Sequence, residues 1–300
     1  MIFRDRVYGM LALATGPYEN LLKPDYTLSP EQLCYSVAIK SVERTGKLDF
    51  LGHLCEHQNQ NLPSFIPNWT GNFTWTHDHQ HKLQTLRIFT AGSDFLVKMK
   101  IISEKMISLG GVIFDTIATS APHICDSHSS LESMQKLKFM VPTEELGLER
   151  YCHTNEIRKE AFLNTICGDT EFFDGDRSWG SWFFRRRKGP LNAMIILSLH
   201  RILDIGPSQP AIANPTESWI KQMAQELTGF KIATHNRRYF SISKGYIGLG
   251  PAKCQEGDLV VVLAGGTVPY IVRPVSPSRQ KDMVAQGLGG NLNEEELLSV

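Results

Sequence analysis

Three features are missing from this sequence, and each absence excludes a class of protein. No apolar stretch reaches the roughly 18 residues that a membrane-spanning helix needs. The 31 Lys and Arg residues balance the 31 Asp and Glu residues, so the chain has no overall charge to attract nucleic acid or acidic lipid. The six cysteines are widely spread and form no C-x-x-C pair, so we expect reduced, mostly buried thiols.

Catalytic and nucleotide-binding signatures are also missing. The glycines at 248 and 250 lack the third glycine of a dinucleotide fingerprint, and no helix is expected after them. No glycine run is followed by Lys-Ser or Lys-Thr, and no Ser-His-Asp motif or nucleophile elbow is recognisable. We therefore expect a protein that is not an enzyme and that binds no cofactor.

The strongest pattern that is present lies between residues 236 and 274. Residues 238–243 alternate between two faces, as in a strand, and residues 246–249 extend the chain again after a turn. Residues 259–263 form an unbroken apolar run, typical of a strand that is buried on both sides. Gly265–Gly266 predict a two-residue hairpin turn with positive φ before a strand at 267–272. The pattern predicts a small antiparallel β module of about three or four strands.

Four motifs occur in a particular order along the chain. The first starts at Asp5 and reads DRVYGMLALA, and the second is Pro24-Asp25-Tyr26. The third starts at Leu62 and reads LPSFIPNW. The fourth covers the β module and reads RRYF-x-x-x-x-GYIGLGP, followed by GDLVVVLAGG-x-VPYIVRP. Together they resemble the region of fungal heterokaryon-incompatibility proteins that follows their HET domain.

The resemblance implies a role in non-self recognition (allorecognition) and programmed cell death between fungal strains, exerted through protein partners. It also implies that the matching residues are structural members of the family motifs. These residues are Tyr8, Asp25, Tyr26, Pro63, Trp69, Arg238, Gly245, Gly248, Gly250, Pro251, Gly257, Asp258 and Pro269.

The sequence departs from the family pattern at two places. The HET domain normally precedes the first motif, whereas this chain starts four residues before Asp5. After Pro274 the family continues with a strand rich in valine and tyrosine, whereas this chain does not. We therefore expect a truncated or diverged member without the effector domain. We also expect an unpaired sheet edge beyond Pro274 and a poorly ordered tail at 275–300.

Helix signals dominate the part before the β module. Ser29 followed by Pro30 and Gln32 predicts a helix start, and Gly46 predicts its end. A second helix is predicted at 155–167, with Thr154 as N-cap. Between them, residues 97–102 and 107–118 predict two strands joined by a charged turn.

The predicted fold class is α+β, with a helical body, a short central sheet and a small C-terminal antiparallel β module. Apolar and capping patterns predict two further helices, at 191–205 and from Asn214 to about residue 227. We therefore expect a mixed body at 1–213 and a second part, 214–274, that joins a helix to the β module.

Three alternatives remain open. His77, His79 and His81 share one side of an extended chain, which suits a metal. With Asp78 or Asp115 they suggest a metal-dependent hydrolase, but the spacing of standard zinc fingers is absent.

The run at 185–188 has four cations beside aromatic residues and would suit nucleic acid. The residues before Ala14 and two glycosylation sequons permit secretion. We favour solvated loops, no metal, no nucleic acid and a cytoplasmic protein.

Overall fold

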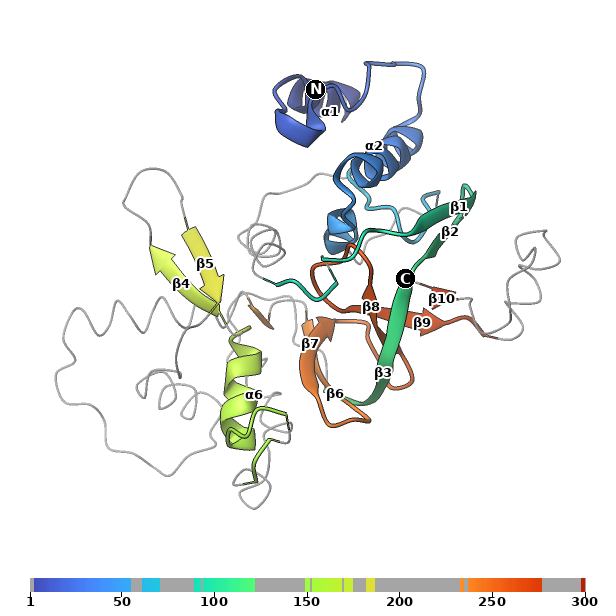
Figure 1. Cartoon of the computed structure of the whole chain (residues 1–300). Coiled ribbons are helices and arrows are strands. Elements are labelled where there is room, and N and C mark those ends of the chain that lie inside the picture. Colours follow the sequence, from blue (N-terminus) through green and yellow to red (C-terminus); the bar gives the residue numbers. More distant parts are fainter. Residues whose placement is uncertain are drawn as a thin grey trace. The chain divides into compact units, whose positions relative to one another are not determined.

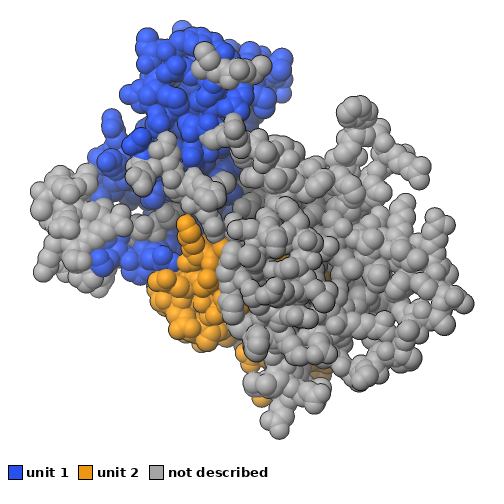
Figure 2. Space-filling model, turned by 180° about the vertical axis from the view of Figure 1, so that it is seen from behind, with its two compact units in different colours: residues 1–114, 259–300 blue, residues 115–258 orange. Residues whose placement is uncertain are grey.

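The chain forms two compact units. A computed structural model describes residues 3–54, 61–70, 89–92, 94–121, 149–151, 153–168, 170–174, 182–186, 233–234, 237–276 and 298–299. Unit 1 holds Met1–Phe114 and Leu259–Val300, and unit 2 holds Asp115–Asp258. Figure 1 labels the helices and strands, and Figure 2 colours the two units.

Two α-helices open unit 1. α1 (Phe3–Ala12) contains most of the first motif, and α2 (Pro30–Thr45) starts at a capping box. Ser29 Oγ accepts the backbone N–H of Gln32 at 3.1 Å, and Gln32 Oε1 accepts the backbone N–H of Ser29 at 2.8 Å. Gly46 follows the helix with a φ of 65°, a left-handed conformation that glycine adopts without a steric cost. Both predicted ends of this helix are confirmed.

The core of unit 1 joins α2 to the C-terminal strands. Cys34, Ala38 and Val42 lie on one side of α2 and are almost fully buried. They belong to one apolar cluster with the 3-10 helix η2 (Asp49–His53), with residues 62–66, and with β8 (Leu259–Leu263) and β9 (Tyr270–Pro274). Residues that are more than 200 positions apart therefore share one core.

Antiparallel strands complete unit 1. β1 (Met99–Ser103) pairs with β2 (Met106–Leu109), which confirms the predicted strands and turn. The second predicted strand is divided at Gly110, after which β3 (Gly111–Ser120) begins. The strand order on this side is β10-β9-β8-β3, where β10 is Leu298–Ser299.

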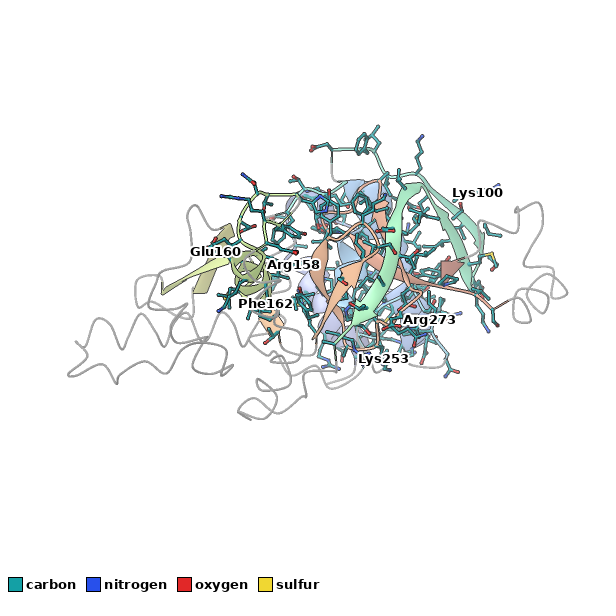
Figure 3. The ribbon with its side chains drawn as sticks, turned by 90° about the horizontal axis from the view of Figure 1, so that it is seen from below. Lys100, Arg158, Glu160, Phe162, Lys253 and Arg273 are labelled. Carbon is teal, nitrogen blue, oxygen red and sulfur yellow. The ribbon has the colours of Figure 1, made fainter. Side chains whose placement is uncertain are left out.

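β3 passes from unit 1 into unit 2, because the boundary falls between Phe114 and Asp115. There the strand order continues as β3-β6-β7, with β6 at Arg237–Ile242 and β7 at Ile247–Pro251. α6 (Arg158–Ile166) packs against these strands. Phe162 lies on the side of α6 nearest the strands (Figure 3). The centre of its ring is 5.1 Å from the centre of the Tyr239 ring.

A separate hairpin in unit 2 pairs β4 (Thr170–Asp174) with β5 (Trp182–Arg186). The described residues thus combine α-helices with antiparallel sheets, in agreement with the α+β class. None of the described helices has the length and apolar character that a bilayer crossing requires. The predicted helices at 191–205 and 214–227, and the boundary at residue 213, lie outside the described residues.

α6 starts later than the sequence predicts. Thr154 does not cap it, because its hydroxyl donates to Glu156 Oε1 at 2.6 Å. Asn155 has a φ of 62°, which is incompatible with a right-handed helix. Arg150 and Ile157 form an antiparallel bridge that holds this segment extended, so the helix begins only at Arg158.

The predicted two-residue turn between β8 and β9 is wrong. The connection runs from Ala264 to Pro269, and within it only Gly265 has a positive φ, of 83°. A distant segment explains the wider loop, because the backbone N–H of Gly265 donates to Gly92 O at 2.9 Å and that of Gly92 donates to Gly266 O at 2.8 Å.

The edge beyond Pro274 also differs from the expectation. Leu298 and Ser299 pair with Pro274 and Arg273 of β9, so part of this strand has a neighbour. Such a short strand is invisible to periodicity, because two residues define no repeat. Residues 277–297 of the predicted tail lie outside the described part.

The capping box predicts a measurable loss of stability in Ser29→Ala. Without the serine oxygen the N–H of Gln32 loses its acceptor, and we expect unfolding to become easier by about 1 kcal/mol in a denaturant titration. Ser36→Ala, inside the same helix, is the control and should change stability by less than about 0.5 kcal/mol. Equal effects of the two substitutions would contradict a role for the cap.

The packing of β6 on β7 predicts a steric cost in Gly248→Ala. A Cβ at this position would lie 2.8 Å from Phe240 Cζ, so the ring must move, and we expect a loss of about 1–3 kcal/mol. Phe240→Leu removes the ring. Thermal unfolding of the double variant should therefore show less destabilisation than the sum of the single variants. Simple additivity would show that the ring and the glycine are not coupled.

Candidate functional site

The first two motifs meet in unit 1. Tyr8, a buried residue of α1, donates its hydroxyl to the backbone oxygen of Asp25 at 2.7 Å. A second bond joins the same two segments: the hydroxyl of Tyr26 donates to Asp5 Oδ1 at 3.2 Å. The rings of Tyr8 and Tyr26 also lie against each other, with their centres 5.4 Å apart. These contacts hold α1 against the loop that precedes α2.

Asp25 has a local structural role in this contact. Its Oδ1 accepts the hydroxyl of Thr27 at 2.6 Å and the backbone N–H of Thr27 at 2.9 Å. Both bonds favour the ionised carboxylate and lower the pKa of Asp25 below its ordinary value of 3.8. The turn is therefore supported above pH 3.8 and loses this support as the pH falls through the lowered value.

The third motif builds the core of unit 1. Leu62, Phe65 and Ile66 are buried in the apolar cluster. The backbone N–H of Ile66 donates to Pro63 O at 3.0 Å, which closes a turn. The half-buried ring of Trp69 meets the ring of His53 edge-on, with 6.3 Å between their centres. Pro63 and Trp69 thus shape a packed segment.

The described cysteines are buried thiols that form no disulfide, as the sequence predicts. They are Cys34, Cys167 and Cys254. Burial raises the pKa of Cys34 to about 11, so this thiol is protonated at neutral pH and is a poor nucleophile.

The fourth motif forms the β6–β7 hairpin of unit 2. Gly245 has a φ of 86°, and its backbone N–H donates to Ile242 O at 2.8 Å to close the turn. Asp115 Oδ2 accepts the backbone N–H of Lys244 at 2.6 Å. This bond lowers the pKa of Asp115. The carboxylate that the hydrolase alternative invokes is therefore engaged in a turn.

The glycine-aspartate turn before β8 is also structural. Asp258 is 2% exposed, and its Oδ2 accepts the backbone N–H of Gln255 at 2.9 Å. Its backbone oxygen accepts the N–H of Ile117 at 2.8 Å, and the N–H of Gly257, whose φ is 89°, donates to Ile117 O at 3.0 Å. The buried carboxylate thus closes the turn, and backbone hydrogen bonds of Gly257 and Asp258 join it to β3.

The remaining motif residues lie close to these turns or in loops. Gly250 pairs with Arg238 across the β6–β7 ladder, and Pro251 pairs with Arg237. The backbone oxygen of Pro251 accepts the N–H of Cys254 at 2.9 Å. Pro269 is exposed in the loop before β9.

The histidines of the metal alternative, unlike Asp115, are not among the described residues. His77, Asp78, His79 and His81 lie outside the described residues. Within the ranges that are described, no three His, Cys, Asp or Glu side chains come together as a metal site would require. The first half of the basic run, Arg185 and Arg186, belongs to β5, and its second half lies outside the described part.

Unit 1 exposes apolar residues that the sequence analysis did not single out. We call Leu96 and Val112 the apolar patch, and their side chains are 86% and 67% exposed. Their chain neighbours Phe95 and Ile113 are also exposed, at 68% and 52%. The backbone N–H of Gly110 donates to Lys98 O at 2.8 Å and continues the ladder of β1 and β2. Leu96 and Val112 each lie two residues beyond this pair, so the alternation of extended chain places them on the same side.

A second group that the sequence did not reveal connects two segments of unit 2. The rings of His153 and Tyr246 stack 3.3 Å apart, and His153 Nε2 lies 3.0 Å from Lys244 O. Beside them, the hydroxyl of Tyr151 accepts the backbone N–H of Ile247 at 3.2 Å. These residues are more than 90 positions apart, so no local pattern joins them.

The contact between the first two motifs predicts a loss of stability in Tyr8→Phe. The substitution leaves the oxygen of Asp25 without its buried donor, and we expect a cost of about 1 kcal/mol in denaturant unfolding. Tyr26→Phe removes a longer and exposed bond, so its effect should be smaller. A larger effect of Tyr26→Phe would show that the exposed contact, and not the buried one, holds α1.

Comparisons with known proteins agree with the motifs. The family model of the Het-6 beta-barrel domain matches residues 221–288, a range that includes β6, β7, β8 and β9. The chain is 24% identical, over 330 aligned positions, to Heterokaryon incompatibility protein 6, OR allele, of Neurospora crassa. No solved structure matches the chain.

The alignment with the Neurospora crassa protein covers 91% of this chain and 45% of that protein. The chain therefore spans less than half the length of this curated relative. Both matches confirm the resemblance to fungal heterokaryon-incompatibility proteins that the four motifs indicate.

Proposed function

We propose that this chain is a recognition region of a heterokaryon-incompatibility protein. It acts in the cytoplasm through protein contacts, without catalysis, in the response that leads from non-self recognition to cell death. The similarity to an incompatibility protein of Neurospora crassa over 91% of the chain is the observation that supports this role.

The use of the polar motif residues supports a non-enzymatic role. Tyr8 and Asp25 fasten α1, while Asp115 and Asp258 fasten turns in unit 2. A catalytic acid or base needs a lone pair or proton that is directed at a substrate. Here these groups are directed at backbone atoms or at neighbouring side chains of the same unit.

The apolar patch supports action through protein contacts. Single exposed apolar side chains are common, but neighbouring ones that are each more than half exposed leave apolar surface in water. A protein partner would remove this surface from water and gain roughly 25 cal/mol for each Å² that it covers. We expect the partner to be another incompatibility protein.

The proposal is tested by expressing the chain in fungal cells, alone and together with the Neurospora crassa relative. We expect the chain alone to leave growth unchanged, and co-expression to alter the survival of cells that undergo the incompatibility reaction. Leu96→Ser with Val112→Ser should reduce this effect about tenfold or more, because loss of a central apolar contact costs roughly 1.4 kcal/mol or more.

Met10→Ser with Leu13→Ser is the matched control, because these side chains are also strongly exposed, at 74% and 83%, but belong to the α1 region. This control should retain the effect of the unaltered chain, and both double variants should unfold at the same temperature as that chain. Death caused by the chain alone, or co-expression without any effect, would contradict the proposal. A hydrolytic activity that disappears with a chelator would also contradict it.

A further inference from the structure

The side of the β1–β2 hairpin that carries the apolar patch also carries positive charge. Lys100 lies on β1, and the hydrogen bond from Gly110 N–H to Lys98 O continues the ladder towards the patch. A Cβ at Gly110 would lie 2.9 Å from the Cβ of Lys98, so these two positions face the same side. Alternation along the extended chain places Lys98 and Lys100 on one side together with the apolar patch. We call this the outer side of the hairpin.

The opposite side of the hairpin is occupied by the core of unit 1. Val97, Met99, Ile107 and Leu109 pack against the apolar cluster that α2 shares with β8 and β9. Since successive residues of a strand point to opposite faces, the outer side points away from this core. An antiparallel sheet with one covered face normally presents polar residues on the other face. The apolar patch is a departure from that rule.

The two lysines of the outer side are exposed and unpaired. Neither Lys98 nor Lys100 makes a hydrogen bond or an ion pair with any residue that the structure describes. The acids nearest to them in the sequence, Asp94 and Glu104, lie in turns at the two ends of this segment. The outer side therefore combines apolar side chains with two positive charges, although the chain as a whole is neutral.

A protein that covers the apolar patch must also approach Lys98. Residues two positions apart on one side of a strand are only about 7 Å from each other, so a segment lying over Leu96 also comes close to Lys98. The lysine ammonium group is strongly hydrated, and removing its water is unfavourable unless a negative group replaces it. A carboxylate on the partner supplies that group. Charge complementarity therefore selects among the proteins that could cover the patch.

We propose that the outer side of the β1–β2 hairpin is a docking surface for an acidic, amphipathic protein segment. In extended form, this segment presents one apolar side chain to the patch and carboxylates, at alternate positions, to Lys98 and Lys100. The pattern apolar-x-acid-x-acid fits because the partner segment and β1 share the same two-residue repeat. The proposal rests on the proposed function, since it specifies the chemistry of the protein contact that the patch makes.

An acidic membrane surface is the less suitable ligand for this side. Recognition of acidic lipids typically uses a cluster of about four to eight Lys and Arg residues, whereas the outer side has Lys98 and Lys100. An opposing protein segment can place a carboxylate beside each of them. We therefore favour a protein, and the test includes lipid as an outcome.

The test uses the purified full chain, labelled with nitrogen-15, and three capped peptides. The first is Thr-Leu-Thr-Glu-Thr-Glu-Thr, and the other two carry Gln or Lys in place of both Glu residues. We expect the glutamate peptide to shift the backbone amides of residues 96–112 in a saturable way. The glutamine peptide should bind about threefold more weakly or worse, because two exposed ion pairs are lost. The lysine peptide should not bind, and raising the salt from about 50 to about 500 mM should weaken the glutamate peptide.

Two pairs of substitutions locate the effect. Lys98→Gln with Lys100→Gln should abolish the preference for the glutamate peptide over the glutamine peptide. Lys40→Gln with Lys47→Gln is the matched control, because these lysines of unit 1 are exposed as well and should leave the preference unchanged. All four positions are exposed, so we expect both double variants to unfold at the temperature of the unaltered chain.

The proposal is overturned if the glutamine or lysine peptide binds as tightly as the glutamate peptide, or if Lys98→Gln with Lys100→Gln keeps the preference. It is also overturned if the glutamate peptide shifts none of the amides of residues 96–112 at about 10 mM, an affinity too weak for recognition. Co-sedimentation of the chain with phosphatidylserine vesicles, without a response to the glutamate peptide, would assign the surface to lipid instead.

Failure of this proposal is distinguishable from failure of the proposed function. The peptide titrations need no fungal cells and no particular partner. A saturable response to the glutamate peptide, together with co-expression that has no effect, would contradict the proposed function and support the docking surface. An effect of co-expression without a response to the peptide would do the reverse.

Discussion

The burial of one side of α2 against β8 and β9 is the constraint on which unit 1 depends. Cys34, Ala38 and Val42 leave water in one cluster with apolar residues from the far end of the chain. This contact fixes where η2 and residues 62–66 must lie, because they fill the rest of the same cluster.

Hydrogen bonds from side chains to the backbone hold the turns and α1 in position. Tyr8, Asp25, Asp115 and Asp258 each satisfy main-chain groups that turns would otherwise leave unpaired. These motif residues thus hold separate segments of each unit together. Their wide spacing along the chain follows from the distances in sequence that the fold must bridge.

Two features are not explained by these hydrogen bonds or by the core. The apolar patch of unit 1 is exposed without a contribution to the core, and the buried Nε of Arg238 in unit 2 has no acceptor among the described residues. Both are unfavourable: the first leaves apolar side chains in water, and the second leaves one buried N–H group without an acceptor.

The sequence by itself determined the local elements. Ser29 with Gln32 and Gly46 specified α2, and the alternation from residue 238 specified the hairpin of β6 and β7, because caps, turns and two-residue periodicity act between near neighbours. The resemblance to incompatibility proteins was likewise present in the four motifs.

The tertiary structure alone decided what depends on distant partners. Gly92 widened the loop after β8, the bridge from Arg150 to Ile157 delayed α6, and residues 298–299 joined β9. Long-range contacts also decided that Leu96 and Val112 are exposed and that Arg238 Nε has no acceptor. Exposure and hydrogen-bond satisfaction are properties of what surrounds a side chain, and long-range contacts supply those surroundings.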